Sequence, residues 1–163
     1  MEEAFTNEEL GRLRRLIDED DIRKLGSMFY QYLDHGYDAR LAELFTEDVV
    51  CEFGPYGVWE GLETVMENFY GVREQLGGTR PVTLHAGGHH WIAFQDRDNA
   101  TGRRQLLDFM VDKKPDENPL LWLALYDEEY RRVDGNWKIA RTSVQFLWPE
   151  RHVTDGFPGD FPG

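Results

Sequence analysis

The clearest structural signal lies in residues 120–148, LLWLALYDEEYRRVDGNWKIARTSVQFLW, which predict two long β-strands joined by a tight turn. The dipeptide Asp134-Gly135 separates the two halves, and such a pair favours an antiparallel hairpin because its residues tolerate positive φ. We therefore expect strands over Leu120–Val133 and Asn136–Trp148.

Outside this hairpin the chain divides into an extended part and a helical part. Extended segments are predicted over Val82–Gln95 and Gly102–Lys113, with turn-forming residues between them. Apolar residues at three- and four-residue steps predict a helix from the acidic cluster 18–21 to about Gly36, preceded by a short helix with Asn7 as its N-cap. Further helices are expected over 39–45 and 62–76, with a strand over 49–53.

This order of elements predicts the fold class. Helices come first and long sequential strands follow, which indicates an α+β fold with N-terminal helices on one face of an antiparallel sheet. The chain has 163 residues, of which 40% are hydrophobic, enough for one domain with its own core. We place that domain at residues 1–150 and interpret residues 151–163, which are rich in Pro and Gly, as a C-terminal tail.

The composition excludes several classes of partner. Eighteen Lys and Arg against 31 Asp and Glu give a formal net charge of −13, which repels phosphate backbones and anionic membrane surfaces. The longest apolar run, Leu120–Tyr126, is far shorter than the ~20 residues that cross a bilayer. Because the N-terminus is acidic rather than basic and then apolar, it is unlike a signal peptide. We expect a cytoplasmic protein that binds neither nucleic acid nor membranes.

Two polar side chains of the second predicted helix are candidate site residues. Tyr30 and Asp34 are four residues apart, so they lie on one helix face, at the flank of the apolar stripe that contains Phe29 and Leu33. Ordinary packing also explains this pair, as a solvated aspartate beside a partly buried tyrosine. A cavity bordered by the same flank is the alternative.

Three of the five histidines lie in residues 84–92, LHAGGHHWI. On an extended strand, His85 and His89 share a face but stand about 13 Å apart, and His90 points to the opposite face. Cys51 is the only cysteine, and no His-x-Glu pattern supplies further ligands, so we predict no metal site and no disulfide. The pair Gly87-Gly88 marks a bulge or a close backbone approach that re-aims His85.

Two further polar residues lie next to apolar strand positions. Asp108 shares a face with Leu106 and Met110, so we expect it in the interior, buried and paired. Tyr126 ends the apolar run that starts at Leu120. It either packs at the edge of the core or aims its hydroxyl into a cavity.

Several motifs occur at spacings shared with a known superfamily. They are Asp21-Ile22-x7-Tyr30-x3-Asp34, the segment 38–46, His85-x3-His89, Thr101-Gly102-Arg103 with Asp108, and Tyr126-x3-Tyr130-x4-Gly135-x-Trp137. They resemble the SnoaL-like branch of the nuclear-transport-factor-two-like superfamily, and within it bile-acid dehydratases and scytalone dehydratase. The resemblance covers about residues 17–150. It implies a cone-shaped α+β barrel, with the N-terminal helices packed on a curved antiparallel sheet.

The same resemblance implies a catalytic pair. Asp34 and His85 match the aspartate and histidine of the catalytic members, Asp108 matches a second acidic position, and Tyr126 matches a tyrosine that binds the leaving or carbonyl oxygen. In such a pair the histidine takes a proton from a carbon next to a carbonyl, because imidazole changes charge near neutral pH. The aspartate fixes the tautomer of the ring. This chemistry needs no cofactor.

The resemblance also indicates what the cavity binds. Phe53 and Phe146 stand where the bile-acid enzymes have a tyrosine and an arginine, so the cavity is expected to be more apolar. The expected substrate-binding residues are Tyr30, Phe53, Tyr56, His89, Asp108, Tyr126 and Phe146. The preferred function is a dehydratase for a hydrophobic polycyclic or aromatic hydroxy-ketone, such as a steroid or polyketide.

Other functions use the same scaffold. A polyketide cyclase or a double-bond isomerase would employ the same pair, whereas the small subunit of a ring-hydroxylating dioxygenase would be noncatalytic. A homodimer or homotrimer is expected, because large apolar residues occupy both faces of the strands and one layer of helices covers only one face. These residues are Trp91, Phe94, Leu107, Phe109, Trp122, Leu123, Phe146 and Leu147.

Overall fold

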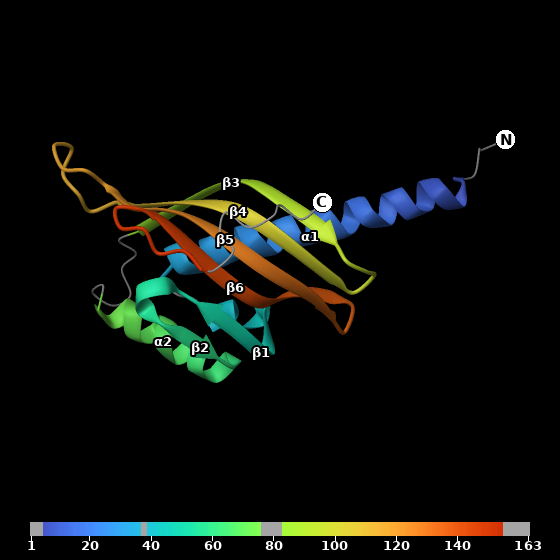
Figure 1. The fold of residues 1–163 in the computed structure, drawn as a ribbon, viewed down its shortest axis with the longest axis horizontal. Coiled ribbons are helices and arrows are strands. Elements are labelled where there is room, and N and C mark those ends of the chain that lie inside the picture. The colour runs from blue at the N-terminus through green and yellow to red at the C-terminus, as the bar shows by residue number, and fades with distance from the viewer. Residues whose placement is uncertain (1–4, 37–38, 76–82, 155–163) are drawn as a thin grey trace.

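The computed structural model describes residues 5–36, 39–75 and 83–154. Its centre is a six-stranded sheet with the strand order β2-β1-β6-β5-β4-β3. In chain order the strands are β1 (Phe45–Glu52), β2 (Val58–Glu60), β3 (Thr83–Phe94), β4 (Asn99–Met110), β5 (Leu120–Val133) and β6 (Asn136–Trp148). The sheet is curved and its two edges, β2 and β3, do not meet (Figure 1).

Helices cover one face of this sheet. Helix α1 (Asn7–Asp34) lies against β3 and β6, and helix α2 (Leu62–Gln75) lies against β1 and β2. Two short 3-10 segments precede and follow β1: η1 (Ala39–Leu44) lies between α1 and β1, and η2 (Gly54–Tyr56) lies between β1 and β2. This arrangement confirms the predicted α+β fold with helices packed on a curved sheet. No helix among the described residues is long and apolar enough to cross a bilayer.

The helical part differs from the expectation in one respect. Helix α1 is continuous through the acidic cluster 18–21, and its N-cap is Thr6, which forms a capping box with Glu9. Residues 12–25 contain no Gly or Pro to end a helix. The Asp18 carboxylate bonds to side chains of the sheet instead of starting a second helix.

The strand part also differs in detail. Strand β1 pairs with β6 in parallel, so the sheet is mixed rather than wholly antiparallel. Strand β2 was not predicted, because three residues are too few for an alternating pattern. Strands β5 and β6 have the predicted bounds. The predicted tail lies largely outside the described residues, which end at 154.

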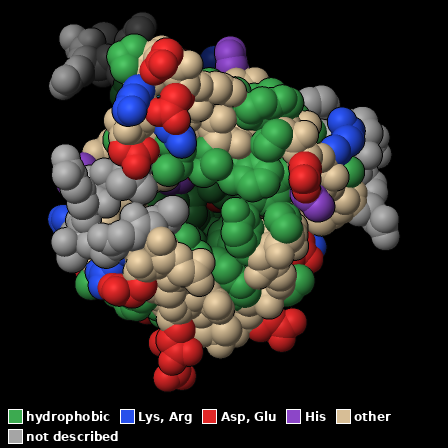
Figure 2. Space-filling model, turned by 90° about the vertical axis from the view of Figure 1, so that its left-hand side faces the viewer, with side chains coloured by type: hydrophobic (Ala, Val, Ile, Leu, Met, Phe, Trp, Pro, Cys, Tyr) green, Lys and Arg blue, Asp and Glu red, His purple; other side chains and the backbone are tan. Residues whose placement is uncertain are grey.

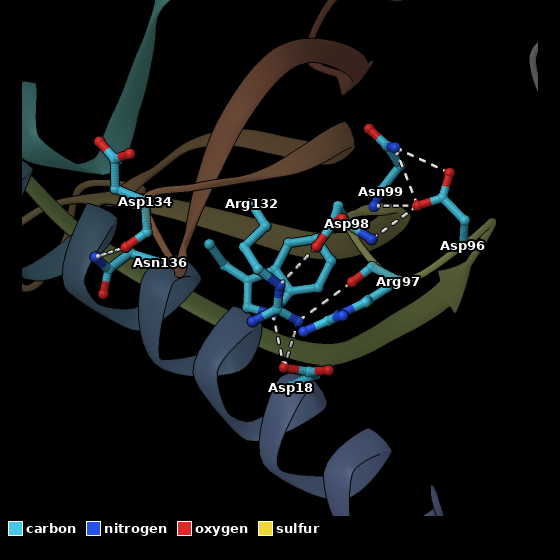
Figure 3. Close-up of polar contacts among 9 residues, drawn as sticks. Asp18, Asp96, Arg97, Asp98, Asn99, Arg132, Asp134 and Asn136 are labelled. Carbon is cyan, nitrogen blue, oxygen red and sulfur yellow. Dashed lines mark hydrogen bonds and ion pairs between the residues drawn. The ribbon is translucent and has the colours of Figure 1, made fainter.

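A cluster of ion pairs joins the middle of α1 to the hairpin ends of the sheet (Figure 3). The Asp18 Oδ1 atom accepts hydrogen bonds from Arg132 Nη2 at 2.7 Å and from Trp137 Nε1 at 3.1 Å. Arg132 also pairs with Asp98 at 3.2 Å, and its guanidinium carbon lies 4.3 Å from the centre of the Trp137 ring. These contacts hold α1 at a fixed angle across the sheet, and so help to place its C-terminal end.

The opposite face of the sheet carries apolar side chains that no described helix covers. Leu84, Leu107 and Leu123 are 50%, 38% and 38% exposed, and Leu107 pairs across the strands with Leu123. Three of the large apolar strand residues lie on the helix side, which agrees with the expectation that such residues occupy both faces of the strands. They are Phe94, Trp122 and Phe146.

A homodimer or homotrimer built on this outer face stays a prediction. Sedimentation of the full chain at micromolar concentration is expected to give two or three times the mass of one chain. A Leu107→Asp/Leu123→Asp variant should sediment as a monomer and keep its circular dichroism spectrum, because both side chains are partly exposed. A monomeric wild-type protein would contradict the prediction.

Candidate active site

A cavity of about 220 Å³ opens at the end of the sheet where β3 begins and β6 ends. Figure 2 shows the hollow from outside, surrounded mainly by hydrophobic side chains. Six of the nine predicted site residues line it: Phe53, Tyr56, His85, Asp108, Tyr126 and Phe146. Asp34 and Tyr30 contact His85 from α1, and His89 lies elsewhere.

Asp34 and His85 meet at the junction of α1 and β3. Asp34 is the last residue of α1, and its Oδ1 atom lies 2.6 Å from His85 Nδ1. The two carboxylate oxygens also accept from the His85 backbone N–H, at 3.0 and 3.2 Å. Because a carboxylate only accepts hydrogen bonds, Nδ1 carries the ring proton and Nε2 keeps a free lone pair. This is the arrangement that a general base requires.

Tyr30 supports the His85 ring rather than lining the cavity. The two rings are stacked, with centres 5.7 Å apart and planes 15° apart. The Tyr30 hydroxyl donates to the Gln105 carbonyl oxygen at 2.9 Å, and burial raises the pKa of Tyr30 to about 12. Gly87 makes room for this ring, since a Cβ atom there would lie 2.3 Å from Tyr30 Cε2. The expected close backbone approach is therefore present.

The predicted bulge in β3 is also present, and it changes where two histidines lie. The pairing register shifts between Gly88 and Trp91, and His89 has a φ of +47°. Beyond the bulge the alternation of side chains is inverted, so His90 turns to the helix side and its Nε2 lies 2.8 Å from the Tyr130 hydroxyl. The expectation that His90 lies on the opposite face from His85 was wrong. His89 is exposed and does not line the cavity with His85.

Asp108 faces His85 from the neighbouring strand. The two residues form a cross-strand pair, and Asp108 Oδ2 lies 3.9 Å from His85 Nε2. The Oδ1 atom is buried and has no hydrogen-bond partner among the described residues. Burial raises the pKa of Asp108 to about 6, against the lowering effect of His85, and Asp34 adds a smaller increase. A carboxyl group in this state holds a proton close to neutral pH and can donate it.

Tyr126 completes the polar end of the cavity. Its side chain is buried, and burial raises the pKa of its phenol well above the ordinary value, so the hydroxyl keeps its proton. Its ring centre lies 4.2 Å from the guanidinium carbon of Arg104. Tyr126 thus packs in the core and also lines the cavity, and a hydroxyl aimed into the cavity stays a prediction.

Aromatic side chains enclose the remainder of the cavity. Trp122 and Phe146 have ring centres 4.5 Å apart, and Tyr56, which is 53% exposed, packs on both at the mouth. Trp59 packs on Phe53 at 4.7 Å. Sequence reasoning missed both tryptophans as site residues. Trp122 was detectable, because it shares the alternation of Tyr126 along β5, whereas the short strand that carries Trp59 offered no such signal.

Within the described ranges, no group of three or more His, Cys, Asp or Glu side chains is placed to hold a metal ion. His85 is engaged by Asp34, and His90 is engaged by Tyr130. A reaction without metal or cofactor stays a prediction.

The SnoaL-like domain family model matches residues 14–143 of this chain. Solved structures with the same fold include a putative scytalone dehydratase from Novosphingobium aromaticivorans, with a TM-score of 0.73 and 21% identity over 88% of this chain and 96% of that one. An NTF2-like protein with a cystatin-like fold from the same species has a TM-score of 0.76 and 21% identity, over 92% and 94% of the two chains.

A third similar structure is the hexachlorocyclohexane dehydrochlorinase LinA-type3 from Novosphingobium barchaimii LL02. Its TM-score is 0.68, with 21% identity over 88% of this chain and 99% of that one. At these identities the three likenesses show a shared fold, and the chemistry of this chain has to be inferred from its own side chains.

The raised pKa of Asp108 predicts how the stability of the fold varies with pH. In the unfolded chain this carboxyl ionises at its ordinary value of 3.8, whereas in the folded chain it holds its proton up to about pH 6. The folded state binds more protons between these values, so this group's contribution to the free energy of unfolding falls as the pH rises from about 4 to 6. Above pH 6 the buried, ionised Asp108 lowers the free energy of unfolding by a constant amount.

Asp108→Asn removes this penalty because an amide does not ionise. We expect the variant to exceed the wild type in free energy of unfolding by up to about 3 kcal/mol at pH 8, and to differ little at pH 4. Urea unfolding of both proteins at the two pH values measures the difference. The same difference at both values would show that burial of an ionised Asp108 carries no cost.

Proposed function

The chain belongs to the SnoaL-like domain family, and we propose that it is a cofactor-independent lyase that removes water from an uncharged cyclic hydroxy-ketone. The observation that carries this proposal is the Asp34–His85 pair, with Nδ1 held at 2.6 Å and Nε2 free beside an apolar cavity. A base fixed in this tautomer is suited to taking a proton from carbon.

In the first step, His85 Nε2 accepts a proton from the carbon next to the substrate carbonyl. The electrons of the C–H bond pass into an enolate, and the charge of the new imidazolium is stabilised by Asp34. The Tyr126 hydroxyl, which keeps its proton, donates a hydrogen bond to the enolate oxygen. His85 and Tyr126 thus each act on one substrate atom, and Asp34 acts through His85.

In the second step, the hydroxyl on the neighbouring carbon leaves as water. The enolate electrons form the carbon–carbon double bond, the C–O bond breaks, and the Asp108 carboxyl supplies the proton. The proton on His85 Nε2 then returns to Asp108, whose Oδ2 lies 3.9 Å away. The proton taken from carbon thus ends on Asp108, and both His85 and Asp108 return to their starting protonation states.

The cavity favours an uncharged substrate. The described residues that line it include no Lys or Arg, and they include Asp108 and His85, whose ring the Asp34 carboxylate holds. A carboxylate or phosphate on the substrate would therefore lack a counter-charge and would face two acidic groups. An acyl thioester with a charged carrier is disfavoured for the same reason.

The volume of the cavity limits how many rings the substrate can have. Its volume of about 220 Å³ lies below the range of about 300–1,000 Å³ that holds drug-sized ligands. We infer a compact one- or two-ring compound in preference to a four-ring steroid. The aromatic walls formed by Phe53, Trp122 and Phe146 suit a flat ring, which stacks on them or meets their edges.

The named relatives support an elimination reaction. One similar structure is that of a putative scytalone dehydratase and another is that of a hexachlorocyclohexane dehydrochlorinase, and each name describes removal of hydrogen together with a leaving group. The same class of reaction requires a base and a nearby proton donor. In this chain His85 and Asp108 provide them.

The proposal is tested with a panel of uncharged β-hydroxy ketones of one to four rings, by following the absorbance of the new conjugated double bond. His85→Gln is expected to lower kcat/KM by at least 10²–10⁴-fold, which is what a general base supplies. Asp34→Asn should also be severely impaired, because it favours the wrong tautomer of His85. Asp108→Asn should remove the fall in rate above pH 6 that loss of its proton causes.

His152→Gln is the matched control, because this histidine is partly exposed and does not line the cavity. Its kcat/KM should equal that of the wild type. Full turnover by His85→Gln on a substrate that the wild type dehydrates would reject the catalytic assignment.

A further inference from the structure

Two oppositely charged side chains are buried behind the aromatic residues of the cavity. Arg104 from β4 and Glu128 from β5 have side-chain exposed fractions of 3% and 0%. Arg104 Nε and Nη2 donate to the two carboxylate oxygens at 2.7 and 2.8 Å. Burial favours a neutral Glu128, but Arg104 outweighs this effect and lowers the pKa of the carboxyl. The pair is therefore ionised at neutral pH.

The positive member of the pair, Arg104, lies on the side of the cavity. The Arg104 guanidinium carbon lies 4.2 Å from the ring centre of Tyr126 and 4.4 Å from that of Tyr30. The Tyr30 ring stacks on His85, and the Tyr126 ring lines the cavity. The positive end of the pair thus contacts the two rings that border the catalytic groups.

The negative end bonds to residues outside the cavity. Glu128 Oε2 accepts from the Tyr130 hydroxyl at 2.6 Å, and that hydroxyl lies 2.8 Å from His90 Nε2. Burial lowers the pKa of His90 to about 4, so His90 is neutral at neutral pH and donates its Nε2 proton to Tyr130. The carboxylate is fully engaged on this side.

Packing alone does not account for an ion pair in this position. Replacing a buried pair by apolar residues of similar volume is often neutral or stabilising, because burial of two charges is costly. A fixed cation that faces a position where negative charge develops contributes to catalysis instead of to stability, because it lowers the energy of the transition state. In the proposed reaction that place is the enolate oxygen beside Tyr126.

We propose that Arg104 is a positioning residue of this reaction. It holds Tyr30 and Tyr126 against its guanidinium and directs positive potential at the cavity. The negative charge of Glu128 offsets the effect of the Arg104 charge on His85. The inference rests on the proposed function for its catalytic meaning. The effect of the two charges on the titration of His85 is tested without any substrate, so this inference and the proposed function can fail separately.

The expected effect follows from the geometry. The His85 and Tyr30 ring centres are 5.7 Å apart, and the guanidinium carbon is 4.4 Å from that of Tyr30, so the charge lies within about 10 Å of His85. An unbalanced unit charge at this distance, with an effective dielectric constant of about 20, changes a proton-binding constant roughly tenfold. The other groups facing His85 are Asp34 from α1 and Asp108 from β4.

The first experiment follows the titration of His85 by NMR in the full chain with isotope-labelled histidine. Glu128→Gln leaves the Arg104 charge unbalanced, because a guanidinium does not lose its proton. The midpoint of the His85 titration should move to lower pH, corresponding to a roughly tenfold weaker affinity for the proton. The double variant Arg104→Met/Glu128→Gln removes both charges and should return the midpoint to within about threefold of the wild type.

His152 is the internal control, because its side chain is 39% exposed and its titration should be the same in every variant. A folded Glu128→Gln protein whose His85 midpoint does not move would overturn the proposal. A midpoint that moves equally in the double variant would also overturn it, because the effect would then come from altered packing.

A second measurement is needed because removing one partner of a buried ion pair can unfold a domain. The double variant keeps no net buried charge and is expected to fold. With saturating 1-tetralone, an uncharged two-ring ketone, the infrared C=O stretch of the bound ligand should lie at lower frequency in the wild type than in the double variant. Equal frequencies would show that Arg104 directs no field at the cavity.

Discussion

The Asp34 carboxylate accepts hydrogen bonds from both the ring and the backbone N–H of His85, and the site depends on this double contact. It joins the last residue of α1 to β3, and it fixes the tautomer of the imidazole at the same time. The position of Asp34 depends in turn on how α1 crosses the sheet. The ion pair between Asp18 and Arg132 holds the middle of the helix, and Tyr30 packs on His85 one turn before the helix ends.

Much of this site could be predicted from the sequence. The spacing of Tyr30 and Asp34 placed both on one helix flank but left open whether a cavity lies there, and the alternation along β4 placed Asp108 in the interior. The family resemblance joined Asp34 to His85, which no local pattern does, since the contact spans 51 positions. The Gly87-Gly88 pair predicted a bulge or a close approach to the backbone, and the structure has both, with Tyr30 as the group that approaches Gly87.

Other features could not be read from local patterns. His89 and His90 were assigned by strict alternation, and the bulge inverted that alternation. The parallel pairing of β1 with β6 depends on the path of the chain through α2. The alternation of side chains within a strand does not indicate whether the strand pairs in parallel or antiparallel. Arg104 and Glu128 resemble ordinary solvated charges in the sequence, and only the packing of β4 and β5 against α1 shows that both are buried.

In the proposed reaction the base and the acid are two residues with different surroundings, His85 and Asp108. His85 has a carboxylate on Nδ1, which leaves Nε2 as the atom that can accept a proton. Asp108 is buried, and its Oδ1 atom has no hydrogen-bond partner among the described residues, which favours a carboxyl that keeps its proton. Such a pair of groups with opposed preferences is typical of acid–base catalysis. In the proposed reaction the buried Arg104–Glu128 pair adds positive potential behind the enolate oxygen.

The most direct test is the exchange of the C2 protons of 1-tetralone for deuterium in D₂O, followed by proton NMR, because it isolates proton abstraction from loss of the leaving group. The wild-type chain is expected to accelerate this exchange, and His85→Gln is expected to return the rate to that of the buffer. Exchange that is equally fast with the wild type and His85→Gln, or no acceleration by a wild type saturated with 1-tetralone, would contradict the assignment of His85 as a base acting on carbon.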